Sequence, residues 1–124
     1  SLKLNYSFLQ AIILGILCNI LVCLAVWLSY SAKNTTDKIL AVFFPISAFI
    51  AAGFEHSIAN MFLIPVTFFI KIFDPMFSTN LTIDLSKFTW PQFLIQNLLP
   101  VTIGNIIGGS LIVGLIYHLS LRKQ

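Results

Sequence analysis

The sequence predicts an all-α transmembrane protein that crosses the membrane three times, with the middle helix broken near the centre of the bilayer. Of its 124 residues, 58% are hydrophobic and 9% are charged, and the mean hydropathy is +0.96. A chain of this size cannot bury so much apolar surface in a soluble core, so it belongs in a membrane. Three apolar stretches, 8–30, 39–70 and 92–121, form the predicted spans within a single membrane domain over 1–124.

The first span, 8–30, carries no charged residue and is long enough to cross a hydrocarbon core of about 30 Å as a helix. It ends in Trp27 and Tyr30, aromatic residues typical of a membrane interface. The link 31–38 is short and polar, which predicts a tight connection between antiparallel helices. Thr36 or Asp37 is expected to cap the second helix.

The middle span, 39–70, is too long for one straight crossing, and Pro45, Gly53 and Pro65 interrupt it. A broken helix at membrane depth is tolerated only where the freed backbone is buried in protein or lines a cavity. We therefore predict two half-helices with an irregular joint near 52–57.

The only charged residue between 39 and 70 is Glu55, and the only histidine there is its neighbour, His56. Inserting an ionised group near the bilayer centre costs about 2.5 to 3.5 kcal/mol on insertion scales. The presence of Glu55 and His56 at this depth therefore indicates a functional site. We interpret the joint as part of a permeation pathway.

The segment 71–91 has neither sustained periodicity nor sustained hydrophobicity, which predicts an exposed loop. The last span, 92–121, is followed directly by Arg122 and Lys123. With three crossings, four basic residues fall on the side of the C-terminus and three on the other side. The positive-inside rule then places the C-terminus in the cytoplasm.

The last span contains small residues that would let another helix approach closely, including a Gly-x-x-x-Gly pattern. They are Gly104, Gly108, Gly109, Ser110 and Gly114. Asn97 and Asn105 in the same span are polar groups that must find partners inside the protein.

Three roles are open for His56: a pore residue, a structural hydrogen-bond partner between helices, or a haem ligand. A neighbouring acid and a helix breaker favour the pore. The other histidine, His118, lies at the membrane edge, the wrong depth for a second haem ligand. Asn19, in the middle of the first span, is the natural partner that would satisfy the imidazole.

Several functional classes are excluded by pattern. There is no plausible serine or cysteine triad, no metal-spaced cluster and no phosphate-binding glycine loop, so we expect a non-enzyme without a cofactor. The net charge of +3 comes from basic residues that sit singly at segment ends, which predicts no nucleic-acid partner.

Three runs, in order along the chain, resemble the formate/nitrite transporter family: 17–27 (LCNILVCLAVW), 53–61 (GFEHSIANM) and 97–109 (NLLPVTIGNIIGG). The match covers essentially the whole chain, but only the second half of that family's protomer. The resemblance implies one inverted-repeat half of an aquaporin-like fold, with the N-terminal half missing. It also implies a homopentamer with one pore per protomer, in the bilayer of a bacterial inner membrane.

The resemblance assigns pore roles to individual residues. His56 matches the family's central pore histidine, and Asn19 matches the asparagine that forms a hydrogen bond with it. Val22 and Phe49 match residues of a hydrophobic constriction.

Lys3 and Glu55 match a charged pair that draws anions towards the vestibule or tunes the histidine. The implied function is a channel for small monovalent weak-acid anions, most favourably formate, with nitrite and hydrosulfide as alternatives. Two other classes stay open: a haem-binding membrane anchor of a redox enzyme, and an aquaporin-like channel for neutral solutes. The second lacks the paired Asn-Pro-Ala motifs expected of it.

Overall fold

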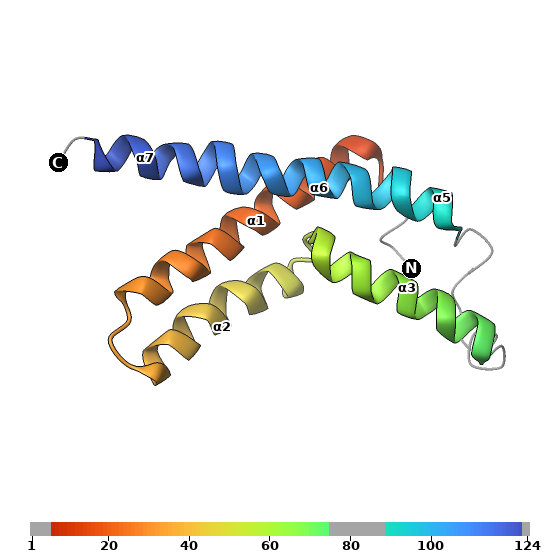
Figure 1. The fold of residues 1–124 in the computed structure, drawn as a ribbon, viewed down its shortest axis with the longest axis horizontal. Helices are drawn as coiled ribbons and strands as arrows, with labels where there is room; N and C mark the ends of the chain where they lie inside the picture. Colours follow the sequence, from red (N-terminus) through yellow and green to blue (C-terminus); the bar gives the residue numbers. More distant parts are fainter. Residues whose placement is uncertain (1–5, 75–88, 123–124) are drawn as a thin grey trace.

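The computed structural model describes residues 6–74 and 89–122, and most of these residues lie in helices (Figure 1). Helices α1 (Phe8–Ser31), α2 (Thr35–Ala51) and α3 (Ser57–Phe73) precede a final continuous helix, Trp90–Leu121. That helix comprises α5 (Trp90–Gln92), a π-helical segment (Phe93–Leu98), α6 (Leu99–Ile106), a second π-helical segment (Ile107–Gly114) and α7 (Leu115–Leu121). The predicted all-helical class is confirmed.

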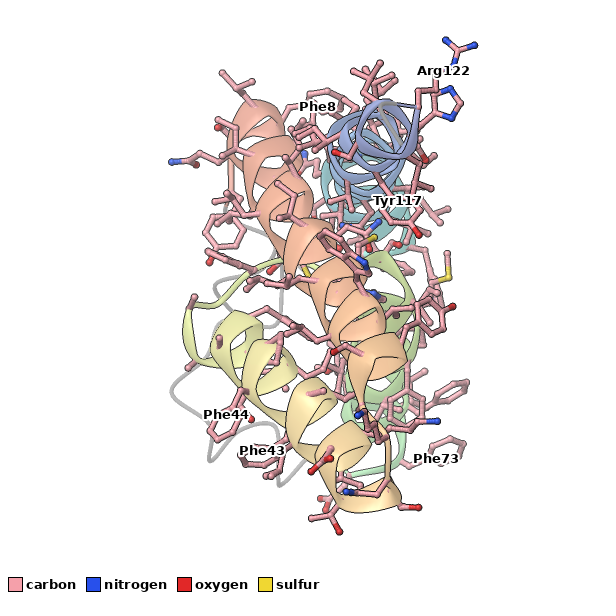
Figure 2. The ribbon with its side chains drawn as sticks, turned by 90° about the vertical axis from the view of Figure 1, so that its left-hand side faces the viewer. Phe8, Phe43, Phe44, Phe73, Tyr117 and Arg122 are labelled. Carbon is pink, nitrogen blue, oxygen red and sulfur yellow. The ribbon has the colours of Figure 1, made fainter. Side chains whose placement is uncertain are left out.

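Two of these helices are long and apolar enough to cross a membrane: Phe8–Ser31, with 24 residues, and Trp90–Leu121, with 32 residues. In Figure 1, α1 crosses the final helix, and α2 runs back beside α1 from the lower left. Helices α2 and α3 lie end to end, and α3 continues below α5. Aromatic side chains such as Phe43, Phe44 and Phe73 project outward (Figure 2), and they are 58%, 65% and 80% exposed.

Polar side chains cap the first two helices. The Ser7 hydroxyl accepts a hydrogen bond from the Gln10 amide, and the Gln10 side chain accepts one from the Ser7 amide. Helix α2 is capped by Asn34, whose Oδ1 lies 2.9 Å from the backbone nitrogen of Asp37. The prediction of Thr36 or Asp37 as the cap is wrong, because both residues lie inside the first turn of α2. There the negatively charged Asp37 side chain interacts favourably with the positive end of the helix dipole.

Helix α1 and the final helix cross with their backbones in contact. A Cβ on Gly104 would overlap the carbonyl oxygen of Ile12, and one on Gly108 would overlap that of Ile16. From the other side, a Cβ on Gly15 would lie 2.8 Å from the Val101 carbonyl oxygen. Gly104 and Gly108 of the predicted small-residue face thus pack directly against α1, which confirms the prediction of a close helix contact.

The helical path breaks between Ala51 and Ser57. Gly53 has φ of 69°, a left-handed conformation that glycine adopts at no steric cost. Pro45 and Pro65 were expected to interrupt the span as well, but they lie inside α2 and α3, and neither ends its helix.

Candidate functional site

The break opens onto a hollow of about 400 Å³, which we call the histidine hollow. Its lining comes from Tyr6 just before α1, the end of α2, the break and the first turns of α3. The lining residues include Tyr6, Phe49, Phe54, Glu55, His56 and Leu63. The structure thus brings three predicted pathway residues, Phe49, Glu55 and His56, to one cavity.

His56 is the N-cap residue of α3. Its backbone is extended, with φ of −115° and ψ of 119°, and its Nδ1 accepts a hydrogen bond of 3.3 Å from the Ala59 amide. The ring of Phe49 stacks against the imidazole, with ring centroids 6.0 Å apart and an interplanar angle of 26°. The imidazole is therefore fixed by one contact from α3 and one from α2.

A single amide on the final helix holds the backbone on both sides of His56. Asn105 Oδ1 accepts hydrogen bonds of 2.9 Å from the backbone nitrogen and the hydroxyl of Ser57. Its Nδ2 donates to the carbonyl oxygens of Glu55 at 3.0 Å and of Gly15 at 2.9 Å. Both acceptor positions and both donors of this buried amide are used, so it connects α1, the break and α6.

Glu55 is completely buried, with 0% of its surface exposed, in a cluster with two equally buried amides. Asn60 Nδ2 lies 2.6 Å from Glu55 Oε2, and Asn97 Nδ2 lies 3.2 Å from the same oxygen. Asn60 Nδ2 also donates to Asn97 Oδ1 at 2.9 Å. We call Glu55, Asn60 and Asn97 the amide cluster. Its donors provide the solvation that a buried carboxylate needs.

Asn19 differs from the expectation. Its Nδ2 donates to the backbone carbonyl of Asn105 at 2.6 Å, and no hydrogen bond joins it to His56 among the residues that the structure describes. The reason is the helix crossing: a Cβ on Gly109 would lie 2.5 Å from Asn19 Nδ2, so the final helix occupies the space beside this side chain. Asn19 therefore binds the backbone of Asn105, the residue whose side chain holds Glu55 and Ser57 on either side of His56.

Val22, another predicted pathway residue, lies away from the histidine hollow. Val22 lines a second hollow of about 310 Å³ between α1 and the final helix, together with Trp27 and Tyr117. The rings of Trp27 and Tyr117 meet edge to face at 5.6 Å. In the part of the chain that the structure describes, Val22 and Phe49 line different cavities. Lys3 lies outside the described residues.

Sequence reasoning left three site residues without a role: Asn60, Asn97 and Asn105. The available signal was an amide side chain in an apolar span, which must be satisfied inside the protein. That signal indicates burial, but it does not identify the partner, since Asn97 and Glu55 are 42 residues apart.

The fold and this site can now be compared with known proteins. The family model described as formate/nitrite transporter matches residues 1–119. The formate channel FocA of Escherichia coli K12 is 50% identical over 119 residues, which cover 93% of this chain and 42% of that protein. The formate channel FocB of the same strain is 40% identical over 126 residues, covering 98% of this chain and 45% of that protein.

A solved structure described as a pentameric formate channel with formate bound matches with a TM-score of 0.84 and 45% sequence identity. The match covers 96% of this chain and 48% of that one, so the chain spans less than half the length of these relatives. The family consists of transporters, in agreement with the prediction of a non-enzyme. This chain belongs to the formate/nitrite transporter family.

Proposed function

We propose that this chain forms one wall of a membrane channel for small monovalent weak-acid anions, with formate as the favoured substrate. The observation that carries the proposal is the imidazole of His56, which is held at a helix break and lines the histidine hollow beside Phe49. The relatives named formate channels support this choice of substrate class. Nitrite and hydrosulfide share the size and charge of formate and are the alternatives.

The chemistry of such a pathway follows from desolvation. A bare monovalent anion loses its hydration at an apolar constriction, whereas its neutral conjugate acid loses much less. Phe49, half-buried at the end of α2, supplies apolar surface next to the histidine. His56 offers a hydrogen bond midway, which offsets part of the desolvation cost of an oxygen or sulfur acceptor.

The described residues supply one side of the hollow. We propose that the opposite wall comes from an N-terminal half of the same protomer, and that five protomers assemble in the bilayer of a bacterial inner membrane with the C-terminus cytoplasmic. The share of the relatives' length that this chain covers supports the first point, and the pentameric structural neighbour supports the second. In that assembly Val22 would face Phe49 across a constriction.

We assign some of the polar residues to the pathway itself and others to the support of the residues that line it. Asn19 supports the site through the Asn105 carbonyl, which in turn belongs to the residue that holds the backbone around His56. Glu55 lies beside the hollow, where the amide cluster holds its carboxyl oxygen. Lys3 retains its proposed role of concentrating anions at the mouth of the pathway.

The test is flux into proteoliposomes that contain the complete assembled protein. Formate, nitrite, hydrosulfide and glycerol are compared over a range of external pH, with protein-free vesicles as the control. Formate flux well above the control that rises as pH falls supports the proposal, because acid increases the neutral fraction of the substrate. Flux of glycerol alone would point to a neutral-solute channel. Soret absorption in the purified protein, without anion flux, would point to a haem anchor.

A further inference from the structure

The second hollow begins beside the helix crossing and follows α1 towards its C-terminal end. At the crossing, Gly104 lies against Ile12. Four residues later in each helix, Gly108 lies against Ile16, so α1 and the final helix run in the same direction. Val22 therefore lines the hollow at its inner end, and the lining residues with higher numbers lead towards the C-terminal ends of both helices.

A contact between two rings bridges the helices where they separate. A Cβ on Gly114 would meet no atom of α1 within 4 Å, so the backbones have moved apart at this point. Close by, Trp27 of α1 and Tyr117 of α7 meet edge to face, with ring centroids 5.6 Å apart and an interplanar angle of 80°. Both rings line the second hollow. The Trp27–Tyr117 pair therefore narrows the outer end of the hollow.

The described wall of the second hollow offers no charged partner to a solute. Within residues 6–74 and 89–122, no carboxylate, ammonium, guanidinium or imidazole group lines it. Most of the lining is valine, glycine and aromatic side chains, which solvate an ion poorly. The width of the outer end, rather than a binding group on this wall, is then the feature that discriminates between solutes.

We propose that the Trp27–Tyr117 pair is a size filter on the side of the C-terminus, which a solute passes before it reaches Val22. The inference rests on the proposed function, in which Val22 belongs to the constriction. While the rings touch, the outer end excludes solutes larger than formate. An edge-to-face contact shifts an equilibrium by about two- to tenfold, so its loss should widen the outer end for a correspondingly larger share of the time.

Cys23 can report on this passage without a flux measurement. Its thiol lines the second hollow between Val22 and the ring pair, and it is half-buried. Cys18 is completely buried, with 0% exposed, and should stay unlabelled. The anionic thiol reagent sulfonatoethyl methanethiosulfonate does not cross bilayers, so from the side of the C-terminus it reaches Cys23 only past the ring pair. Loss of the label in Cys23→Ser assigns the site.

The experiment uses the complete protein in oriented membrane vesicles, with the side of the C-terminus facing the reagent. Mass spectrometry follows the labelling of Cys23. Labelling should be slow in the wild type and about two- to tenfold faster in Trp27→Ala and in Tyr117→Ala. The double variant should be no faster than either single variant, because both substitutions remove the same contact. Tyr117→Phe retains the ring and should label as slowly as the wild type.

Tyr30→Ala is the matched control. Tyr30 lines the same hollow and is 81% exposed, but within the described part of the chain it has no ring partner. Its removal should leave the labelling rate close to that of the wild type. Equal acceleration in Tyr30→Ala and Tyr117→Ala would overturn the filter. Absence of labelling in every variant would also overturn it, since another part of the complete protein would then fill the hollow.

Flux separates this inference from the proposed function. Formate flux through the wild type should fall once Cys23 carries the label. Flux that is unchanged by complete labelling would place the second hollow off the pathway and overturn the inference, while the proposed function would stand. Absence of any anion flux before labelling would overturn the proposed function, whereas the labelling rates would still decide whether the ring pair closes the hollow.

Discussion

Asn105 Oδ1 lies 2.9 Å from both the backbone nitrogen and the hydroxyl of Ser57. Ser57 is the residue after His56, and the same Asn105 side chain donates to the carbonyl of Glu55, the residue before it. The position of the candidate pore histidine is thus set by an amide on the final helix, 48 residues after Ser57.

Replacing Asn105 with alanine should destabilise the protein strongly. The substitution leaves buried groups of Ser57, Glu55 and Gly15 without their partner, and a stranded buried group costs about 1 to 3 kcal/mol. We expect a total loss of about 3 kcal/mol or more in the free energy of unfolding, measured by thermal denaturation of the purified protein. Asn34→Ala, the same substitution at the exposed cap of α2, should cost only about 1 kcal/mol. Equal losses in the two variants would contradict the role of Asn105.

The helix crossing predicts a sharp difference between two glycines of the final helix. Gly104→Ala introduces a methyl group against the carbonyl oxygen of Ile12, which is backbone and cannot rotate away. Overpacking of this kind destabilises a protein by about 1 to 3 kcal/mol. The Gly104→Ala protein should therefore lose its assembled state at a lower temperature than the wild type. Gly114→Ala meets only the Gly109 carbonyl oxygen at 3.4 Å, an ordinary contact, and should be tolerated. Equal stability of the two variants by size-exclusion chromatography after heating would refute the close crossing.

The break and the crossing show what a sequence can predict about this fold. Gly53 fell within the predicted joint because a left-handed backbone conformation nearly requires glycine, and the Gly-x-x-x-Gly pattern marked a close helix contact. Pro45 and Pro65 were less informative. A proline removes one backbone hydrogen bond and can kink a helix that nevertheless continues, so its presence does not locate an end.

Replacing Glu55 with glutamine should destabilise the protein less than replacing it with leucine, which has no oxygen to accept a hydrogen bond. In Glu55→Gln, an amide oxygen can still accept from Asn60 and Asn97, although more weakly than a carboxylate. In Glu55→Leu, both amides lose this acceptor inside the protein. We therefore expect Glu55→Leu to lower the thermal midpoint well below that of Glu55→Gln. The reverse order would mean that the amide cluster does not support the fold.

Phe49 should control passage beside the histidine. Phe49→Ala removes the ring that stacks on His56 and enlarges the histidine hollow, so flux of solutes larger than formate should increase. Phe44→Ala is the control on the same helix, since Phe44 is 65% exposed and projects outward (Figure 2). Uptake of acetate or lactate into proteoliposomes measures the change. If both variants retain the selectivity of the wild type, Phe49 is not part of a constriction.

The site was harder to predict than the fold, because its contacts link distant parts of the sequence. The helix break marked His56 from the sequence alone, whereas Phe49 was assigned to the pathway only through the family resemblance; the structure places both at one hollow. The partner of Asn19 could not, since it depends on how closely the final helix approaches α1 at Gly109. The burial of Glu55 likewise depends on Asn97, on a helix whose position the local sequence does not specify.

The most direct test of the account is formate flux through His56→Ala compared with His118→Ala, the two histidine substitutions that this chain allows, in proteoliposomes over a range of pH. A hydrogen bond to a charged group contributes about 1.5 to 3 kcal/mol, so loss of the His56 donor should lower formate flux about tenfold or more and change its pH profile. His118→Ala should match the wild type. Flux through His56→Ala that equals the wild type at every pH would contradict the placement of His56 in the pathway.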